Sequence, residues 1–467
     1  MDRSGQLFIE PLEPRELLAL VPQTITVRVF LDHNSDSRRN RNEVGIAGYH
    51  VTAKGLRDAN GANLTGTGIT DAKGIARFTT YVDSESSSLP TAAISLGRVD
   101  AYRCLNQSSN DRGTIFGEAS PSIHFAMVDY QNLNLTVWNS YQVSGSGEVV
   151  TRLIDRLVFD DLNGNARCDD GEPSARTNED GEAWIKLHSG IHTLRVAPGD
   201  DWKAAPGRSL AWRLDFRAGS PKATEGYFKV TMKDPVIVDV LAAYTDAAAA
   251  THNHDGGAFI NDLVETANEV LANSDTNVRL RLVQAVHTDY VEAGDIESDL
   301  KHLSSSRDGE MDDLLALRKT DHADLVTLIS GMPIGSDGEI DDDILGIGYE
   351  FNYGVGNSNA LAFSVVRVGG GDDGFTFAHE IGHNLGAGHD VDHARNSHLP
   401  VPYAHGYVFS DVDGMLYQDV MAYGPGWVIP FFSTPLFHYA GKPIGNAGTA
   451  DNARAIRQIA PDVARYR

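Results

Sequence analysis

The chain has 467 residues, too many for one compact core, which indicates two to four domains. It has no apolar run of about 18 residues, which excludes a membrane-spanning helix. The formal net charge of -25 excludes a typical nucleic-acid-binding protein, because phosphate backbones require a basic surface. Two cysteines, Cys104 and Cys168, exclude a disulfide framework, and whether they pair stays open.

The N-terminal segment, residues 1–22, lacks the basic region and apolar stretch of a signal peptide. The sequence LEPRELL at Leu12–Leu18 nevertheless resembles the LEPR-x-L-L segment near the start of large secreted or surface proteins of certain bacteria. The resemblance implies that residues 1–22 are a leader. It also implies a bacterial protein that is secreted or held at the cell surface.

A diverged repeat follows this leader. Strand-like runs at Thr24–Phe30 and Leu153–Phe159 each precede an acidic, Asn-rich loop. A Thr-x-x-x-Gly turn comes next in both copies, at Thr70–Gly74 and Thr177–Gly181. Short strands between Gly- and Asn-rich turns predict two β-sandwiches. We expect them over residues 23–142 and 148–230, with linkers at Val143–Gly147 and Ala218–Gly226.

After Pro235 the pattern changes to alternating strands and helices. Several apolar runs have the length of buried strands, and between them the apolar residues from Ile260 to Leu271 recur at the spacing of a helix. The predicted strands are Val236–Ala243, Val278–Val286, Asp324–Ile329 and Ala360–Val366, with a further helix around Met311–Arg318. This order predicts an α/β catalytic domain over residues 234–467, with a mixed sheet covered by helices.

A histidine-rich segment, HEIGHNLGAGH over residues 379–389, is the candidate metal-binding and catalytic site. Residues four apart share one face of a helix, so His379 and His383 can bind one metal ion. Gly386 permits the positive φ that ends the helix and returns His389 to the same ion. Three imidazole ligands leave a fourth position for water, as in catalytic zinc sites. Glu380 lies where it can take a proton from that water.

This spacing is the signature of metzincin zinc peptidases, which the segment resembles. Met421, in the sequence DVMAYG, is similar to the methionine that metzincins place beneath the zinc. Tyr423 matches a tyrosine that ligates zinc or stabilises the oxyanion in the astacin and serralysin branches; the alternative is that it only walls the pocket. Asp390 is like the residue that follows the third histidine in reprolysins. The resemblance implies that Glu380 and Tyr423 are catalytic and that Gly386, Asp390 and Met421 are structural.

From about Pro235 to the C-terminus, half of the chain resembles the bacterial peptidyl-Asp metallopeptidase and reprolysin-like group. The similar segments are VDVLAAYT at 238–245, VRLRLV at 278–283, YAHGY at 403–407 and IPFFS at 429–433. Relatives often carry disulfides in this domain, whereas this stretch has no cysteine.

Metzincins bind the substrate backbone along an edge strand just before the zinc helix. The run Ala360–Val366 has that position, and an ordinary strand of the sheet is the alternative. The resemblance therefore implies substrate binding by Ala360, Leu361, Ala362 and Phe363. Histidines outside the motif, among them His393, His398, His405 and His438, are expected to be structural or to lie at the surface.

Each acidic loop spaces its oxygen-bearing side chains as a calcium-binding loop does, with a backbone carbonyl at the seventh position. The expected ligands of the second loop are Asp161, Asn163, Asn165, the carbonyl of Arg167, Asp169 and Glu172. Those of the first loop are Asp32, Asn34, Asp36, the carbonyl of Arg38, Asn40 and Glu43.

Both loops depart from an EF-hand, because Ser37 and Ala166 replace the glycine at the sixth position and a strand precedes each loop. The context is instead similar to the calcium-binding B-type repeats of bacterial surface adhesins, which are β-sandwiches. That resemblance covers roughly residues 24–78 and 153–196 and implies structural calcium. Asx-rich turns without metal are the alternative, more so for the first loop, where Arg39 and Arg41 reduce the negative charge.

These features predict a multidomain, exported zinc metalloendopeptidase with two N-terminal β-sandwiches and an α/β metzincin domain. It would act on proteins or peptides, with one catalytic Zn²⁺ and structural Ca²⁺. The alternatives are a calcium-dependent surface adhesin with a latent protease domain and an enzyme that mainly processes its own chain. The presence of Glu380 argues against a pure binding module, which needs no general base.

Overall fold

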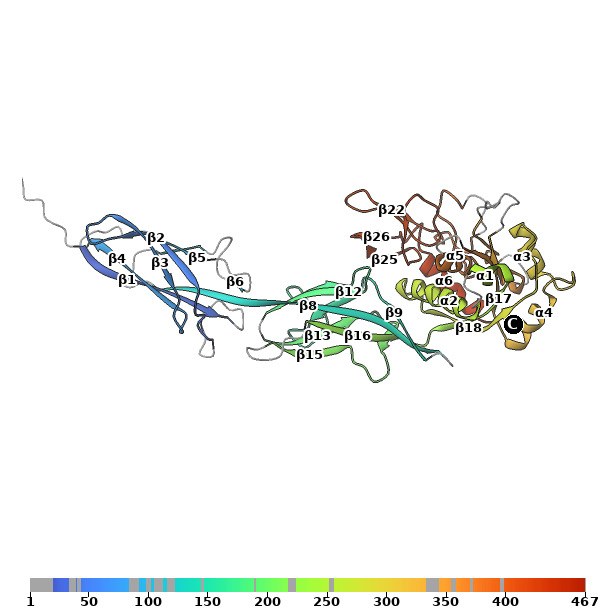
Figure 1. Ribbon diagram of the computed structural model, residues 1–467, viewed down its shortest axis with the longest axis horizontal. Coiled ribbons are helices and arrows are strands. Elements are labelled where there is room, and N and C mark those ends of the chain that lie inside the picture. Colours follow the sequence, from blue (N-terminus) through green and yellow to red (C-terminus); the bar gives the residue numbers. More distant parts are fainter. Residues whose placement is uncertain are drawn as a thin grey trace, which may run out of the picture. The chain divides into compact units, whose positions relative to one another are not determined.

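The computed structural model describes residues 20–32, 39, 43–83, 92–97, 102–104, 112–115, 122–143, 147–188, 190–216, 224–251, 256–332, 344–353, 358–369, 373–394 and 399–466. Most of the predicted leader lies outside these residues, and its last three residues already belong to the first strand. β-sheets come first along the chain and a mixed α/β region follows, which confirms the predicted fold class (Figure 1).

The chain divides into two compact units. One comprises Met1–Asn132, Lys186–His192 and Leu214–Lys222, and the other comprises Leu133–Ile185, Thr193–Arg213 and Ala223–Arg467. This division lies elsewhere than the predicted linker at Val143–Gly147. The division falls inside one long strand, β8 (Ser122–Val143), which then pairs back on β9 (Gly147–Arg152) as a hairpin. A Gly- and Ser-rich hairpin connection has the same composition as a linker, so the sequence did not distinguish them.

The first unit is a β-sandwich in which two sheets share one core. β1 lies between β4 and β8, and β2 lies between β3 and β5. The alternation in β1 buries Ile25, Val27 and Val29 in the core that also holds Val51 and Ile94. The strands are β1 (Leu20–Leu31), β2 (His50–Arg57), β3 (Asn63–Ile69), β4 (Ile75–Asp83), β5 (Ala92–Leu96), β6 (Tyr102–Cys104) and β7 (Arg112–Ile115).

The second β region places the last part of β8 between β9 and β16. A separate four-stranded sheet has the order β11-β10-β13-β15. The predicted strand at Leu153–Phe159 is interrupted, because Asp155 adopts a φ of +55° and β10 begins only at Leu157. The strands are β10 (Leu157–Asp160), β11 (Ser174–Arg176), β12 (Glu182–His188), β13 (Ile191–Ala197), β14 (Trp202–Ala204), β15 (Ala211–Asp215) and β16 (Glu225–Met232).

The two Thr-x-x-x-Gly turns have the same local geometry. The hydroxyl of Thr70 donates to Ile46 O and accepts from Tyr49 N, and that of Thr177 donates to Leu153 O and accepts from Arg156 N. The glycine that ends each turn has a φ of +71°. Matched hydrogen bonds at matched positions support the internal repeat.

The C-terminal sheet has the order β18-β17-β19-β21-β20, with parallel neighbours except for the short antiparallel edge strand β20. Helix α2 buries the apolar face predicted from Ile260 to Leu271 and packs on β18 and on α5. The strands are β17 (Val236–Tyr244), β18 (Val278–His287), β19 (Leu325–Gly331), β20 (Gly346–Gly348) and β21 (Phe363–Val368). The helices are α1 (Asp246–Thr251), α2 (Gly256–Asn273), α3 (Ile296–Ser304), α4 (Asp312–Asp321), α5 (Asp373–Asn384) and α6 (Asn452–Val463). Short strands complete the C-terminal part: β22 (Val408–Ser410), β23 (Leu416–Gln418), β24 (Trp427–Val428), β25 (Thr434–Tyr439) and β26 (Lys442–Ile444).

The predicted edge strand at Ala360–Val366 is wrong in two respects. Ser358–Leu361 forms a 3₁₀ turn, and β21 begins only at Phe363. β21 also lies inside the sheet, between β19 and β20, and all six of its residues are buried. The true edge strand, β20, has three residues, two of them glycine, and therefore carries no alternating pattern that would reveal a strand.

The second β region packs directly on the catalytic domain within one compact unit, although the sequence suggested a linker between them. Ile154 shares an apolar cluster with Phe431 and Phe437. The buried guanidinium of Arg156 donates to Ala272 O at 2.9 Å, and its central carbon lies 4.5 Å from the ring centroid of Phe437. These contacts join the β region to the catalytic domain.

Among the described residues, every helix is too short or too polar to cross a bilayer.

Candidate active site

Helix α5 positions two of the three motif histidines. Phe377, Ala378 and Ile381 face the core, and His379 and His383 are buried on a shared face. The helix ends at Asn384, and Gly386 follows with a φ of +88°. A Cβ at this glycine would lie 2.3 Å from Cδ1 of Ile459, so both the turn and the packing require glycine there.

The turn brings the third histidine to the first two. The Nε2 atoms of His379, His383 and His389 lie 3.0–3.1 Å from one another. A point about 2.0–2.1 Å from all three, the usual zinc–imidazole distance, therefore exists beside them. Among the described residues, these three form the one group of three or more His, Cys, Asp or Glu side chains whose ligand atoms lie within 4.8 Å of one another.

Backbone carbonyls orient the imidazole rings. Nδ1 of His379 lies 2.6 Å from Val420 O, and Nδ1 of His383 lies 3.1 Å from Ala387 O. A carbonyl can only accept, so each Nδ1 carries the proton and each Nε2 presents a lone pair to the centre. Burial, and then the neighbouring His389, lower the pKa of His379 to about 4, so this ring is neutral. Neutral imidazoles with converging lone pairs fit a zinc ion.

The methionine turn supports the ligand helix. Met421 is fully buried, and a Cβ at Gly382 would lie 2.6 Å from its sulfur. The same turn supplies the Val420 carbonyl that accepts from His379. The structure therefore places Met421 against the helix that carries His379 and His383.

Glu380 lies buried against the edge strand β20. Its Oε2 has no hydrogen-bond partner among the described residues, and burial raises its pKa to about 8. A Cβ at Gly346 would lie 2.4 Å from Glu380 Oε1, and one at Gly348 would lie 3.1 Å from Oε2. The missing side chains of these two glycines thus make room for the carboxylate. Their role was not predictable from sequence, since nothing local links residue 346 to residue 380.

Tyr423 and Asp390 flank the histidines. The ring centroid of Tyr423 lies 4.6 Å from that of His389 and 5.5 Å from that of His379. The side chain of Asp390 accepts from Tyr423 N at 2.9 Å and contacts Nδ1 of His393 at 2.8 Å. Burial alone would raise the pKa of Asp390, but the hydrogen bonds from Tyr423 and His393 lower it. Asp390 therefore holds the methionine turn next to the ligand loop.

Two histidines expected to be structural or at the surface lie beside this centre. His393 is half-exposed, and its ring centroid lies 5.6 Å from that of Tyr423. Nδ1 of His405 lies 2.9 Å from the carbonyl oxygen of His389 and steadies the third ligand through its backbone. Neither ring has the spacing of a metal ligand, so the sequence offered no signal for these positions.

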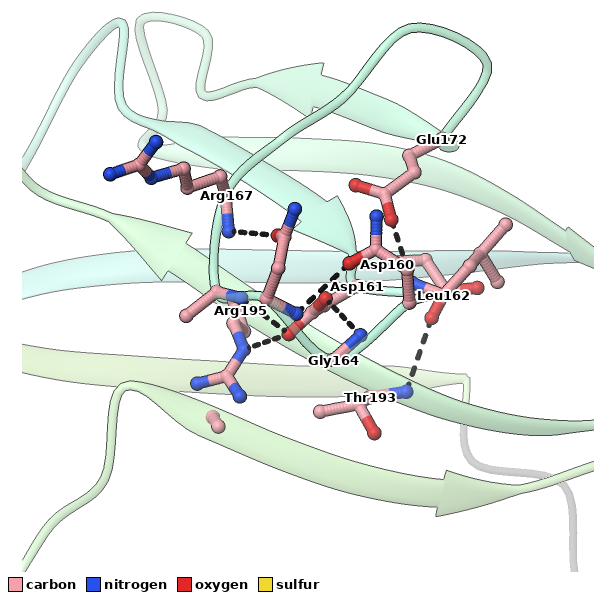
Figure 2. A network of polar contacts seen from close by, with 12 residues as sticks. Asp160, Asp161, Leu162, Gly164, Arg167, Glu172, Thr193 and Arg195 are labelled. Carbon is pink, nitrogen blue, oxygen red and sulfur yellow. Dashed lines mark hydrogen bonds and ion pairs between the residues drawn. The ribbon is translucent and has the colours of Figure 1, made fainter.

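The second acidic loop forms a closed network of hydrogen bonds (Figure 2). The carboxylate of Asp161 accepts from Gly164 N at 2.8 Å and Ala166 N at 3.1 Å, and it pairs with Arg195. That of Glu172 accepts from Leu162 N at 2.9 Å. Backbone and guanidinium donors thus already engage the first and last expected calcium ligands.

Side chains in the middle of this loop also lie close together. The amide groups of Asn163 and Asn165 each lie 2.6 Å from Oδ2 of Asp169. Arg167 donates its backbone N–H to Asn165 Oδ1 at 2.8 Å. Cys168, in the same loop, is an exposed free thiol.

Most of the first acidic loop lies outside the described residues, namely Asn34, Asp36, Arg38 and Asn40. Its first and last members, Asp32 and Glu43, are described and both are buried.

Comparison with known proteins agrees with this geometry. Residues 234–410 match a family model described as metallo-peptidase family M12. A curated "Peptidyl-Asp metalloendopeptidase" of Stenotrophomonas maltophilia (strain K279a) is 29% identical over 245 residues, 52% of this chain and 55% of that protein. One of Pseudomonas aeruginosa (strain PAO1) is 32% identical over 50% of this chain and 41% of its own length. The chain thus spans about half the length of the curated relatives it matches.

Among solved structures, a chain from "Structure of a chaperone-substrate complex" is similar with a TM-score of 0.39 and 19% identity, over 56% of this chain and 39% of that one. The sequence relatives are bacterial, and residues 234–410, which match the family model, contain the histidine centre. Residues 234–410 therefore form a metallopeptidase domain of family M12, homologous to the peptidyl-Asp metalloendopeptidases.

Proposed function

We propose that the protein is a zinc-dependent endopeptidase that hydrolyses internal peptide bonds of protein substrates. The observation that carries this proposal is the convergence of three Nε2 atoms, 3.0–3.1 Å apart, next to the buried Glu380. Bound there, zinc supplies a Lewis acid for the scissile carbonyl and acidifies the attacking water. His379, His383 and His389 would hold it.

The protein's own groups perform the proton transfers. Glu380 takes a proton from the water as the water attacks the carbonyl carbon, and it returns that proton to the leaving amine nitrogen. Tyr423, whose ring lies beside the ligand rings, donates a hydrogen bond to the developing oxyanion. A substrate segment in extended conformation would add to the open side of β20, the edge strand beside Glu380.

The replacement Glu380→Gln tests this function. It keeps the size of the side chain but removes the base, so we expect casein cleavage to fall about 10²–10⁴-fold while zinc stays bound. The exposed Glu297, in the first turn of α3, provides the matched control Glu297→Gln with unchanged activity. A Glu380→Gln protein that cleaves casein at the wild-type rate would sink the proposal.

We also propose that the Asp161–Glu172 loop binds calcium. The convergence of Asn163 and Asn165 on Asp169 supports it, because amide groups can turn their oxygens inward and join carboxylates around an ion. Calcium would stiffen the β region that packs on the catalytic domain.

Export is a further part of the proposal. The LEPR-like segment supports secretion or attachment to the cell surface. Detection of the protein in the medium or on intact bacterial cells would bear this out, and confinement to the cytosol would contradict it.

A further inference from the structure

A cavity of about 590 Å³ lies in the same compact unit as the histidine centre and is lined by none of its residues. The end of β8 forms one wall, and α2 and β18 form the others. Its volume falls within the range of about 300–1,000 Å³ that is usual for sites of small ligands. The cavity is therefore large enough for a compact organic molecule.

Two buried donors at this cavity have no acceptor in the described part of the chain. The guanidinium of Arg279 lies 4.2 Å from the ring centroid of Tyr141, its Nη2 is buried without a hydrogen-bond partner, and it has no ion pair among the described residues. The neighbouring Arg281, by contrast, forms a bidentate pair with Asp239 at 2.6 and 2.7 Å. A half-buried cation without a counter-ion is unfavourable, so Arg279 is suited to an anionic ligand group.

Tyr141 adds the second donor. Its side chain is only 6% exposed, and its hydroxyl has no hydrogen-bond partner in the described part of the chain. The amide of the adjacent Asn268 exchanges two hydrogen bonds with the backbone of Leu280, one as donor and one as acceptor. Burial raises the pKa of Tyr141 to about 12, so the hydroxyl keeps its proton. Arg279 and Tyr141 together fit one carboxylate.

Carboxylates and apolar groups line the rest of the cavity. Asp262 and Glu265 come from α2 and would attract a cation. Val264 of α2, Leu282 of β18 and Ile237 of β17 supply apolar surface. A ligand that satisfies all of these groups carries a carboxylate, an ammonium and an apolar body.

We propose that this cavity binds a short zwitterionic peptide with apolar side chains. Its C-terminal carboxylate accepts from Arg279 and Tyr141, and its α-ammonium group faces Asp262 and Glu265. The inference stands apart from the proposed peptidase function, since binding here requires neither zinc nor Glu380. If the protein is a peptidase, its own products belong to this class of ligand.

Calorimetric titration of the full chain with the dipeptide leucyl-leucine tests the proposal. Two analogues are titrated for comparison: leucyl-leucine amide lacks the carboxylate, and N-acetyl-leucyl-leucine lacks the ammonium. We expect each analogue to bind at least about tenfold more weakly than the dipeptide, a difference of about 1.4 kcal/mol. Arg279→Gln and Tyr141→Phe should weaken the dipeptide but leave the amide's affinity unchanged.

Controls separate this cavity from the zinc site. Arg208 packs over the ring of Tyr227 in the same way as Arg279 packs over Tyr141, but Arg208 does not line the cavity. The variant Arg208→Gln should therefore bind the dipeptide as the wild type does. His383→Ala should also retain binding, because its change affects only the zinc site. Tyr141→Phe keeps the ring and provides the test if Arg279→Gln fails to fold. The proposal would be overturned by any of three results. The dipeptide and its amide could bind with equal affinity, the wild type and Tyr141→Phe could bind the dipeptide equally, or millimolar dipeptide could fail to bind.

Discussion

The histidine centre and the Asp161–Glu172 loop both gather residues of metal-binding type, yet their atoms are used differently. At the centre, three Nε2 atoms face one another at 3.0–3.1 Å, and backbone carbonyls contact the Nδ1 atoms of His379 and His383. In the loop, backbone N–H groups donate to both oxygens of Asp161 and to Glu172. The centre thus presents free lone pairs that a cation would join, whereas the loop keeps its shape through its own hydrogen bonds. We therefore expect zinc to be required for the proposed activity and calcium to add only stability.

After the loss expected for Glu380→Gln, the next largest effect should come from Tyr423, which would make the centre a catalyst as well as a metal site. Removing one oxyanion donor typically lowers kcat about 10²–10³-fold, so we expect Tyr423→Phe to lose that much on casein while zinc content is unchanged. Tyr227 is equally exposed, at 52%, and Tyr227→Phe is the control. An unchanged kcat for Tyr423→Phe would mean that the tyrosine only walls the pocket.

A smaller loss should follow from adding one methyl group to the edge strand. The Cβ of Gly346→Ala would overlap Glu380 Oε1, at 2.4 Å, and displace the carboxylate. A shift of about 1 Å in a catalytic group can lower activity about 10²-fold, so we expect a loss of that size with zinc retained. Gly257→Ala, where a Cβ meets nothing within 4 Å, serves as the control. Wild-type kcat in Gly346→Ala would show that Glu380 does not depend on this clearance.

The smallest effect concerns the loop. If it binds calcium, an ion concentration of a hundred times Kd stabilises the folded state by about 2.7 kcal/mol, which raises Tm by several degrees. We expect this rise in calcium relative to EGTA, and we expect Glu172→Gln to abolish it while Glu297→Gln keeps it. Equal Tm values in calcium and EGTA for the wild type would argue for a metal-free Asx-rich turn.

The catalytic motif was predictable from sequence because its geometry is local. His379 and His383 share a helical face, and Gly386 takes the positive φ that its position after the helix requires. The apolar period of α2 and the alternation in β1 likewise follow from short-range spacing. Each of these predictions depends on residues only a few positions apart.

Contacts between distant residues were not predictable in this way. The edge strand β20 is recognisable only through its pairing with β21 and the fit of Gly346 against Glu380. The packing of Arg156 against Phe437 likewise joins segments that the sequence analysis treated as separate domains. The strand β8 has 22 residues, far more than the usual number of about 5–6, and it extends through both β regions. Because such a length is not expected from sequence, the Gly- and Ser-rich segment after it was predicted to be the linker between two domains.

Metal analysis of the purified protein, combined with casein digestion with and without 1,10-phenanthroline, is the decisive test of a zinc-dependent peptidase. We predict about one zinc ion per chain, cleavage that stops with the chelator, and recovery when zinc is restored. Protein without zinc, or casein cleavage that the chelator leaves unchanged, would contradict the account.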